Sequence, residues 1–140
     1  MDFLQFLIDK NNILVVGVAL VSGAMLLLPT LRKGRGGSAL DTTAAIQMVN
    51  QRQAVWVDVR AAEQFQVGHI AQSRSVPADE LEKKAAALPK NKPLIVVCEQ
   101  GRAAPRMAQR LKALGHAEVF TLDGGMRAWY AANLPVTQKG

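Results

Sequence analysis

The stretch from Pro93 to His116, "PLIVVCEQGRAAPRMAQRLKALGH", places an apolar run, a short polar loop and a helical pattern one after another. The four residues before Cys98 are all apolar, which is typical of a strand buried on both faces of a parallel sheet. After the loop, apolar residues recur at helical spacing until Gly115, a residue type that commonly ends helices. The stretch therefore predicts a strand, a loop and a helix, with the loop at the carboxyl end of the strand.

The same alternation of strand and helix extends through residues 39–140. Short β-rich runs occupy residues 54–59, 73–77 and 117–122, and helical patterns occupy residues 41–51, 61–70, 78–88 and 124–133. Strands that alternate with helices at this spacing predict an α/β domain with a parallel sheet flanked by helices on both faces. Sites in such folds form at the carboxyl ends of the strands, where Asp58, Cys98 and Asp123 are expected to lie.

The segment Ile13–Leu31 contains no charged residue. As a helix it would be roughly 28 Å long, close to the ~30 Å thickness of the hydrocarbon layer. We therefore expect one transmembrane helix at about residues 12–31 within an N-terminal segment 1–33, a glycine-rich linker at 34–38 and a domain at 39–140. Arg32, Lys33 and Arg35 follow the apolar segment, so a single-pass protein with its C-terminal domain in the cytoplasm is predicted.

Composition excludes several kinds of site. The chain has one cysteine and two histidines, and the histidines lack the spacing of a zinc motif, so we expect no disulfide framework, metal or cofactor. The net charge of +6 is spread along the chain without a nucleic-acid-binding motif, and we expect no nucleic-acid partner.

Cys98 is either a buried structural cysteine or a reactive thiol. Its position between a strand and a helix favours reactivity, because a tight loop there turns backbone N–H groups toward a negative charge. Gly101 permits such a loop, and Pro105 suits the first helical position. The positive end of the helix dipole would then face the sulfur and stabilise a thiolate.

Arg102, Arg106 and Arg110 form a basic stripe from the loop along the helix. Cations near a helix N-terminus are electrostatically unfavourable, so a basic residue there suggests a use. We expect Arg102, inside the loop, to hold an anionic substrate or the thiolate. For Arg106 and Arg110, a solvated helix face is the preferred interpretation.

Four segments resemble motifs of the rhodanese-like (sulfurtransferase) domain family. They are "VDVR" at residues 57–60, "EQFQVGHI" at 63–70, "VVCEQGRA" at 96–103 and "LDGGMRAW" at 122–129. The similarity extends over about residues 39–135, and the four motifs stand in the family's order. A membrane helix before one such domain also resembles a membrane-bound bacterial subgroup, which implies the bacterial inner (cytoplasmic) membrane as the location.

The resemblance implies sulfane-sulfur transfer through a persulfide on Cys98, with no cofactor or metal. The implied donor is a small anionic sulfur compound such as thiosulfate, or a protein persulfide, and a protein thiol is a possible acceptor. Glu63 and His69 are expected to be scaffold residues. The substrate-binding loop is expected to comprise Glu99, Gln100, Gly101, Arg102 and Ala103, with structural support from Asp58, Arg60, Gly124 and Gly125.

Two positions depart from the family pattern. Ala103 offers no side-chain contact to a substrate, and Glu99 places a negative charge beside Cys98 that would repel thiosulfate. Weak activity with thiosulfate is therefore expected. The alternative function is a non-catalytic rhodanese-like module that recruits a partner at the membrane. A cysteine-dependent phosphatase is disfavoured, because that chemistry requires arginine where Ala104 stands.

Overall fold

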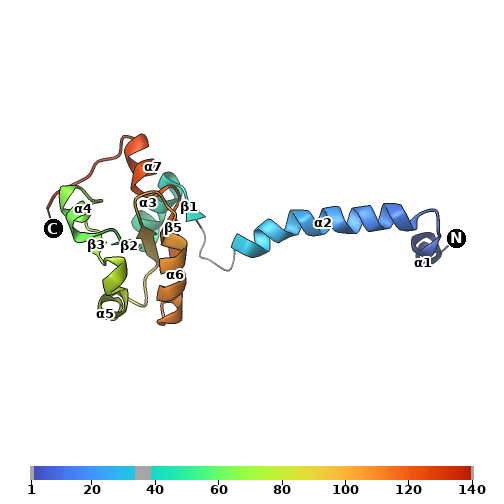
Figure 1. Cartoon of the computed structure of the whole chain (residues 1–140), viewed down its shortest axis with the longest axis horizontal. Coiled ribbons are helices and arrows are strands. Elements are labelled where there is room, and N and C mark those ends of the chain that lie inside the picture. The colour runs from blue at the N-terminus through green and yellow to red at the C-terminus, as the bar shows by residue number, and fades with distance from the viewer. Residues whose placement is uncertain (1, 34–38, 140) are drawn as a thin grey trace. The chain divides into compact units, whose positions relative to one another are not determined.

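The computed structural model describes residues 2–33 and 39–139, with the backbone alone for residues 27–33. The chain divides into two compact units, Met1–Gly34 and Arg35–Gly140. The predicted linker at residues 34–38 lies outside the described residues. Figure 1 shows both units, and most of their helices and strands carry the labels used below.

The N-terminal unit consists of helices α1 (Phe3–Ile8) and α2 (Ile13–Lys33). Among residues 2–33 and 39–139, no helix combines the length and the apolar character that crossing a membrane requires. The predicted transmembrane helix at about residues 12–31 is therefore wrong. That prediction rested on the lack of charge in the segment and on its length as a helix, which is close to the thickness of the hydrocarbon layer. The predicted cytoplasmic orientation and inner-membrane location, which nothing in the structure tests, stay predictions.

The second unit is built on a five-stranded parallel sheet in the order β1-β5-β4-β2-β3. The parallel sheet agrees with the prediction from the alternating pattern. The strands are β1 (Ala39–Leu40), β2 (Val55–Asp58), β3 (Arg74–Ser75), β4 (Leu94–Val97) and β5 (Val119–Leu122). The helices are α3 (Thr42–Arg52), α4 (Ala62–Val67), the 3₁₀ turn η1 (Ala78–Glu80), α5 (Leu81–Ala85), α6 (Ala104–Ala113) and α7 (Gly125–Ala131).

Helices cover both faces of this sheet, which explains the continuous apolar run of β4. Successive strand residues point to opposite faces, and Leu94 and Val96 pack in a core with residues of α5 and α6. Ile95 and Val97 pack on the other face, in a core with residues of α3 and α7. Figure 1 shows these two pairs of helices on either side of the strands. All four residues of β4 are buried, so the strand is fixed in the centre of the domain.

The helix ends follow local signals. Asp41 caps α3, because its carboxylate accepts the N–H of Ala44 at 2.7 Å. Helix α6 begins at Ala104, so Pro105 occupies its second position rather than the first, where it was expected. The edge strand β1 was not predicted. Its two residues are recognisable only from their pairing with Thr121 and Leu122 of β5.

Candidate functional site

Cys98 follows the last residue of β4, at the floor of the loop that leads into α6. Its residue surface is 5% exposed, and its side chain borders the core beneath α6. The backbone N–H of Gly101 donates a hydrogen bond to Cys98 Sγ at 3.0 Å. A donor aimed at sulfur stabilises negative charge there, so this contact distinguishes Cys98 from a cysteine that merely fills space.

Glycines bring the start of α7 against this loop. A side chain at Gly125 would place its Cβ 2.2 Å from the Cys98 carbonyl oxygen, and one at Gly101 would lie 2.8 Å from the Gly124 nitrogen. Because neither position carries a side chain, the backbones touch directly. The N–H of Met126 donates to the Cys98 carbonyl at 2.8 Å, and that of Arg127 donates to the Glu99 carbonyl at 3.0 Å. The α7 backbone therefore holds the first two loop residues in place.

A buried ion pair supports the loop from β2. The Arg60 guanidinium donates to both Asp58 carboxylate oxygens at 2.8–3.1 Å and to the Gly68 carbonyl at 2.7 Å. Its remaining terminal nitrogen, Nη1, lies 3.3 Å from the Glu99 carboxylate. Burial by itself lowers the pKa of Arg60, but the hydrogen bonds and charges of Asp58 and Glu99 outweigh burial and raise that pKa above its ordinary value.

The other loop residues face solvent. Gln100, Arg102 and Ala103 are exposed, and the N–H groups of these three residues donate to no other group in the described part of the chain. Gly101 has φ +82, a left-handed conformation that favours glycine. The loop thus has one N–H engaged with the sulfur, while the N–H groups of its exposed residues make no other hydrogen bond in the described part of the chain.

The predicted basic stripe separates into different environments. Arg110 forms an ion pair with Glu82 and donates to the Ala78 carbonyl at 3.4 Å, so it joins α6 to η1 and α5. Arg106 is exposed. Arg102 lines a pocket of about 330 Å³ together with Gln100 and residues of α7, including Arg127. Arg102 therefore borders a cavity beside the loop.

Neither of the two predicted scaffold residues forms a hydrogen bond with the sulfur in the described part of the chain. His69 is buried, stacks on Phe65 and contacts the carbonyl oxygens of Phe65 and Lys139 at 2.7 and 2.8 Å. Glu63 is exposed in the first turn of α4. Within the described parts of the chain, no three histidine, cysteine, aspartate or glutamate side chains are grouped so that they could hold a metal ion.

This geometry can be compared with known proteins. The family model for the rhodanese-like domain matches residues 41–132. The chain belongs to the rhodanese-like domain family. The resemblance of the four motifs is thereby confirmed, and the matched region contains the whole Cys98 loop and the glycines of α7.

Relatives of this rhodanese-like domain include a thiosulfate sulfurtransferase GlpE from Vibrio cholerae. It is 33% identical over 97 residues, which cover 69% of this chain and 92% of the relative. The uncharacterized protein YibN of Escherichia coli is 36% identical over 102 residues, covering 67% of this chain and 68% of that protein. A crystal structure of the BH2092 protein from Bacillus halodurans aligns with a TM-score of 0.67 at 25% identity, covering 81% and 85% of the two chains. Together with the family, the GlpE relative supports an activity of the sulfurtransferase kind.

Sequence reasoning missed two contacts that shape the site. The sequence shows a negative charge at Glu99, but its partner Arg60 is 39 positions away and no local pattern joins them. The α7 residues Met126 and Arg127 support the loop through their backbone N–H groups, which every non-proline residue has. The "LDGGMRAW" motif was the available signal for the second contact, since its paired glycines indicated a close backbone approach.

Proposed function

We propose that the rhodanese-like domain carries sulfane sulfur as a persulfide on Cys98 and passes it to a thiophilic acceptor. The observation that supports this function best is the hydrogen bond from the Gly101 N–H to Cys98 Sγ at 3.0 Å. A backbone donor already aimed at the sulfur stabilises an anionic sulfur without reorganisation of the loop. The neighbouring N–H groups of the loop would bind the outer sulfur of the persulfide.

The proposed reaction has two displacements. In the first, the Cys98 thiolate attacks the outer sulfur of thiosulfate, a Cys98 S–S bond forms, and the S–S bond of thiosulfate breaks to release sulfite. In the second, an acceptor thiolate attacks the outer sulfur of the persulfide, and the Cys98 thiolate leaves. Neither step changes the net charge or requires an oxidant. The side chain of Arg102 is exposed beside the loop and would attract an anionic donor.

The low exposure of Cys98 limits which reagents reach it. With 5% of the residue surface exposed, a small donor such as thiosulfate suits the site. A protein persulfide or a protein thiol would have to present its sulfur on a narrow, protruding segment. The same low exposure favours the alternative, a non-catalytic module that recruits a partner. The two functions make opposite predictions about sulfur loading.

Intact-mass measurement of the full chain separates them. Incubation with thiosulfate or with a small persulfide should add about 32 Da, one sulfur atom, to the wild type and nothing to Cys98→Ser. Cyanide or a thiol should then remove the added mass. A folded wild-type protein that gains no sulfur from either donor would support the interaction module instead.

Arg102→Ala tests the donor side of the proposal. Loading by thiosulfate should slow several-fold, and the effect should shrink at high salt, because an exposed cation acts through a screened charge. The free energy of unfolding should stay within about 0.5 kcal/mol of the wild-type value. A change in unfolding without a change in loading would make Arg102 a structural residue.

A further inference from the structure

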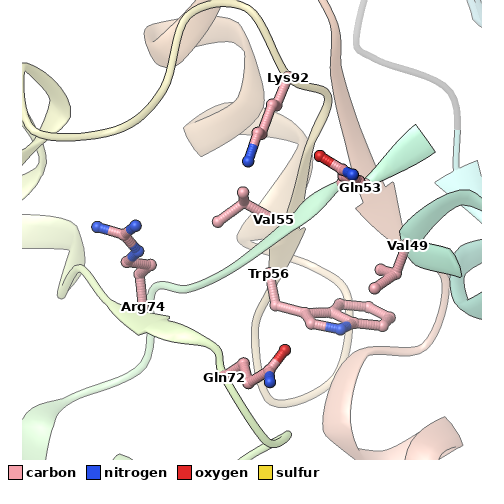
Figure 2. A pocket seen from close by; sticks show the side chains of 8 residues that line it. Val49, Gln53, Val55, Trp56, Gln72, Arg74 and Lys92 are labelled. Atoms are coloured by element: carbon pink, nitrogen blue, oxygen red, sulfur yellow. The ribbon is translucent and has the colours of Figure 1, made fainter.

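A second hollow lies at the opposite end of the sheet from Cys98. Its volume is about 400 Å³, and it is formed where β2 and β3 begin and β4 is about to begin. Gln53, Val55, Trp56, Gln72, Arg74 and Lys92 line it, and Figure 2 shows these side chains around the start of β2. Four residues of β4, about 13 Å of strand, separate this end from the loop, so a ligand here would not touch the sulfur.

The polar side chains around this hollow are hydrogen-bond donors that are unpaired within the described part of the chain. The side chains of Arg74, Lys92, Gln53 and Gln72 form no hydrogen bond or ion pair with any residue that the structure describes. Figure 2 shows the Lys92 side chain pointing toward Val55, while the Arg74 side chain extends from β3 on the other side of Val55. No aspartate or glutamate belongs to the lining, so the two positive charges are not neutralised there.

The backbone at two lining positions is unusual. Gln53 and Gln72 have φ of 57 and 66, in the left-handed region that residues other than glycine rarely adopt. Among the described residues, only Asn133 shares this property without being glycine. Gln53 adopts this conformation as the residue that ends α3, where its backbone N–H donates to the Met48 carbonyl. The left-handed conformation of Gln72 costs on the order of 1 kcal/mol. The side-chain amides of Gln53 and Gln72 flank Trp56, whose ring is fixed by an edge-on contact with Trp129 at 5.4 Å between centroids.

We infer that this hollow binds a small organic anion, through a phosphate or carboxylate group held by Arg74 and Lys92. A guanidinium presents a planar fork of N–H donors that matches either oxyanion, and an ammonium adds a point charge. The two glutamine amides supply further hydrogen bonds, and Val55 and the Trp56 ring contact the apolar part of the ligand. The volume lies within the range of small-molecule sites.

The test uses inorganic pyrophosphate and succinate as probes on the full chain, at constant ionic strength. Binding is followed by NMR through the side-chain amide signals of Gln53 and Gln72 and the indole N–H of Trp56, which are distant from the loop. At least one probe should shift these signals saturably. The probe that binds more tightly identifies the oxyanion as phosphate or carboxylate.

Charge variants supply the control. Arg74→Gln with Lys92→Gln should raise the dissociation constant at least tenfold. The control is the double variant Lys83→Gln and Lys112→Gln, which removes the same charge from exposed or partly exposed positions outside the hollow. It should change the dissociation constant of the probe less than twofold. Signals that do not move with either probe, or equal weakening by both pairs, would overturn the inference. Cys98→Ser should bind like the wild type, since this site is separate from the sulfur.

Discussion

Replacing Gly125 by alanine should distort the Cys98 loop more than it disturbs any other part of the domain. The new Cβ would lie 2.2 Å from the Cys98 carbonyl oxygen and 2.8 Å from the Gly101 nitrogen. An unstrained carbon–oxygen contact is about 3.3 Å, so the backbones must separate by about 1 Å. That movement weakens the hydrogen bonds of Met126 and Arg127 to the loop, about 1 kcal/mol each, and alanine at φ +58 adds about 1 kcal/mol of strain.

The expected total loss is about 3 kcal/mol in the free energy of unfolding, measured by urea denaturation. Sulfur loading of Cys98 should fall at least tenfold, because the Gly101 N–H moves with the loop. Gly115→Ala is the matched control: its φ of +105 also disfavours alanine, but the nearest atom outside its own neighbours is Lys90 Nζ, 3.5 Å away. Gly115→Ala should lower the free energy of unfolding only by the backbone strain, and Cys98 should load sulfur as in the wild type. If the two variants behave alike in both assays, the close approach at Gly125 does not position the loop.

Three other substitutions test the charges around the site. Asp58→Asn leaves the buried Arg60 guanidinium without its main carboxylate and should lower the free energy of unfolding by about 3 kcal/mol in urea denaturation. A loss under about 1 kcal/mol would refute the supporting role of the ion pair between Asp58 and Arg60. Glu99→Gln should increase the rate of sulfur loading by thiosulfate several-fold in low salt but not in high salt. An increase of the same size at both salt concentrations would refute repulsion of thiosulfate by the Glu99 charge. A hydrogen bond from Arg110 lowers the pKa of Glu82. The wild type should therefore have a higher free energy of unfolding than Glu82→Gln above pH 4.5, and this difference should disappear as the pH falls through the lowered pKa. A difference that is unchanged at low pH would contradict this prediction.

The centre of the fold could be predicted from the sequence because its signals are local. The apolar run of β4 and the helical spacing of α6 each extend over several residues, and the loop between them contains the single cysteine. The edge strand β1 has two residues, and so short a strand is defined by its partner rather than by its own pattern. The absence of charge at residues 12–31 was an insufficient criterion for a membrane span.

The position of the Cys98 loop was predictable from the sequence, but its contacts were not. Cys98 and its loop could be located because a strand end, a glycine and a helix start are visible in sequence. The ion pair between Arg60 and Glu99, and that between Arg110 and Glu82, join segments far apart in the chain. Such pairs depend on how helices pack against the sheet, and the sequence of either segment alone does not contain that information.

The most direct test of the account is the NMR signal of the Gly101 backbone N–H in the reduced, sulfur-loaded and Cys98→Ser proteins. A donor that contacts the cysteine sulfur should give a resonance that shifts when the outer sulfur is added and again when the sulfur is replaced by oxygen. The N–H groups of Gln100 and Arg102 should shift on loading as well, because they would bind the added sulfur. If the Gly101 resonance is the same in all three proteins, the loop does not stabilise charge on Cys98, and the persulfide mechanism loses its structural basis.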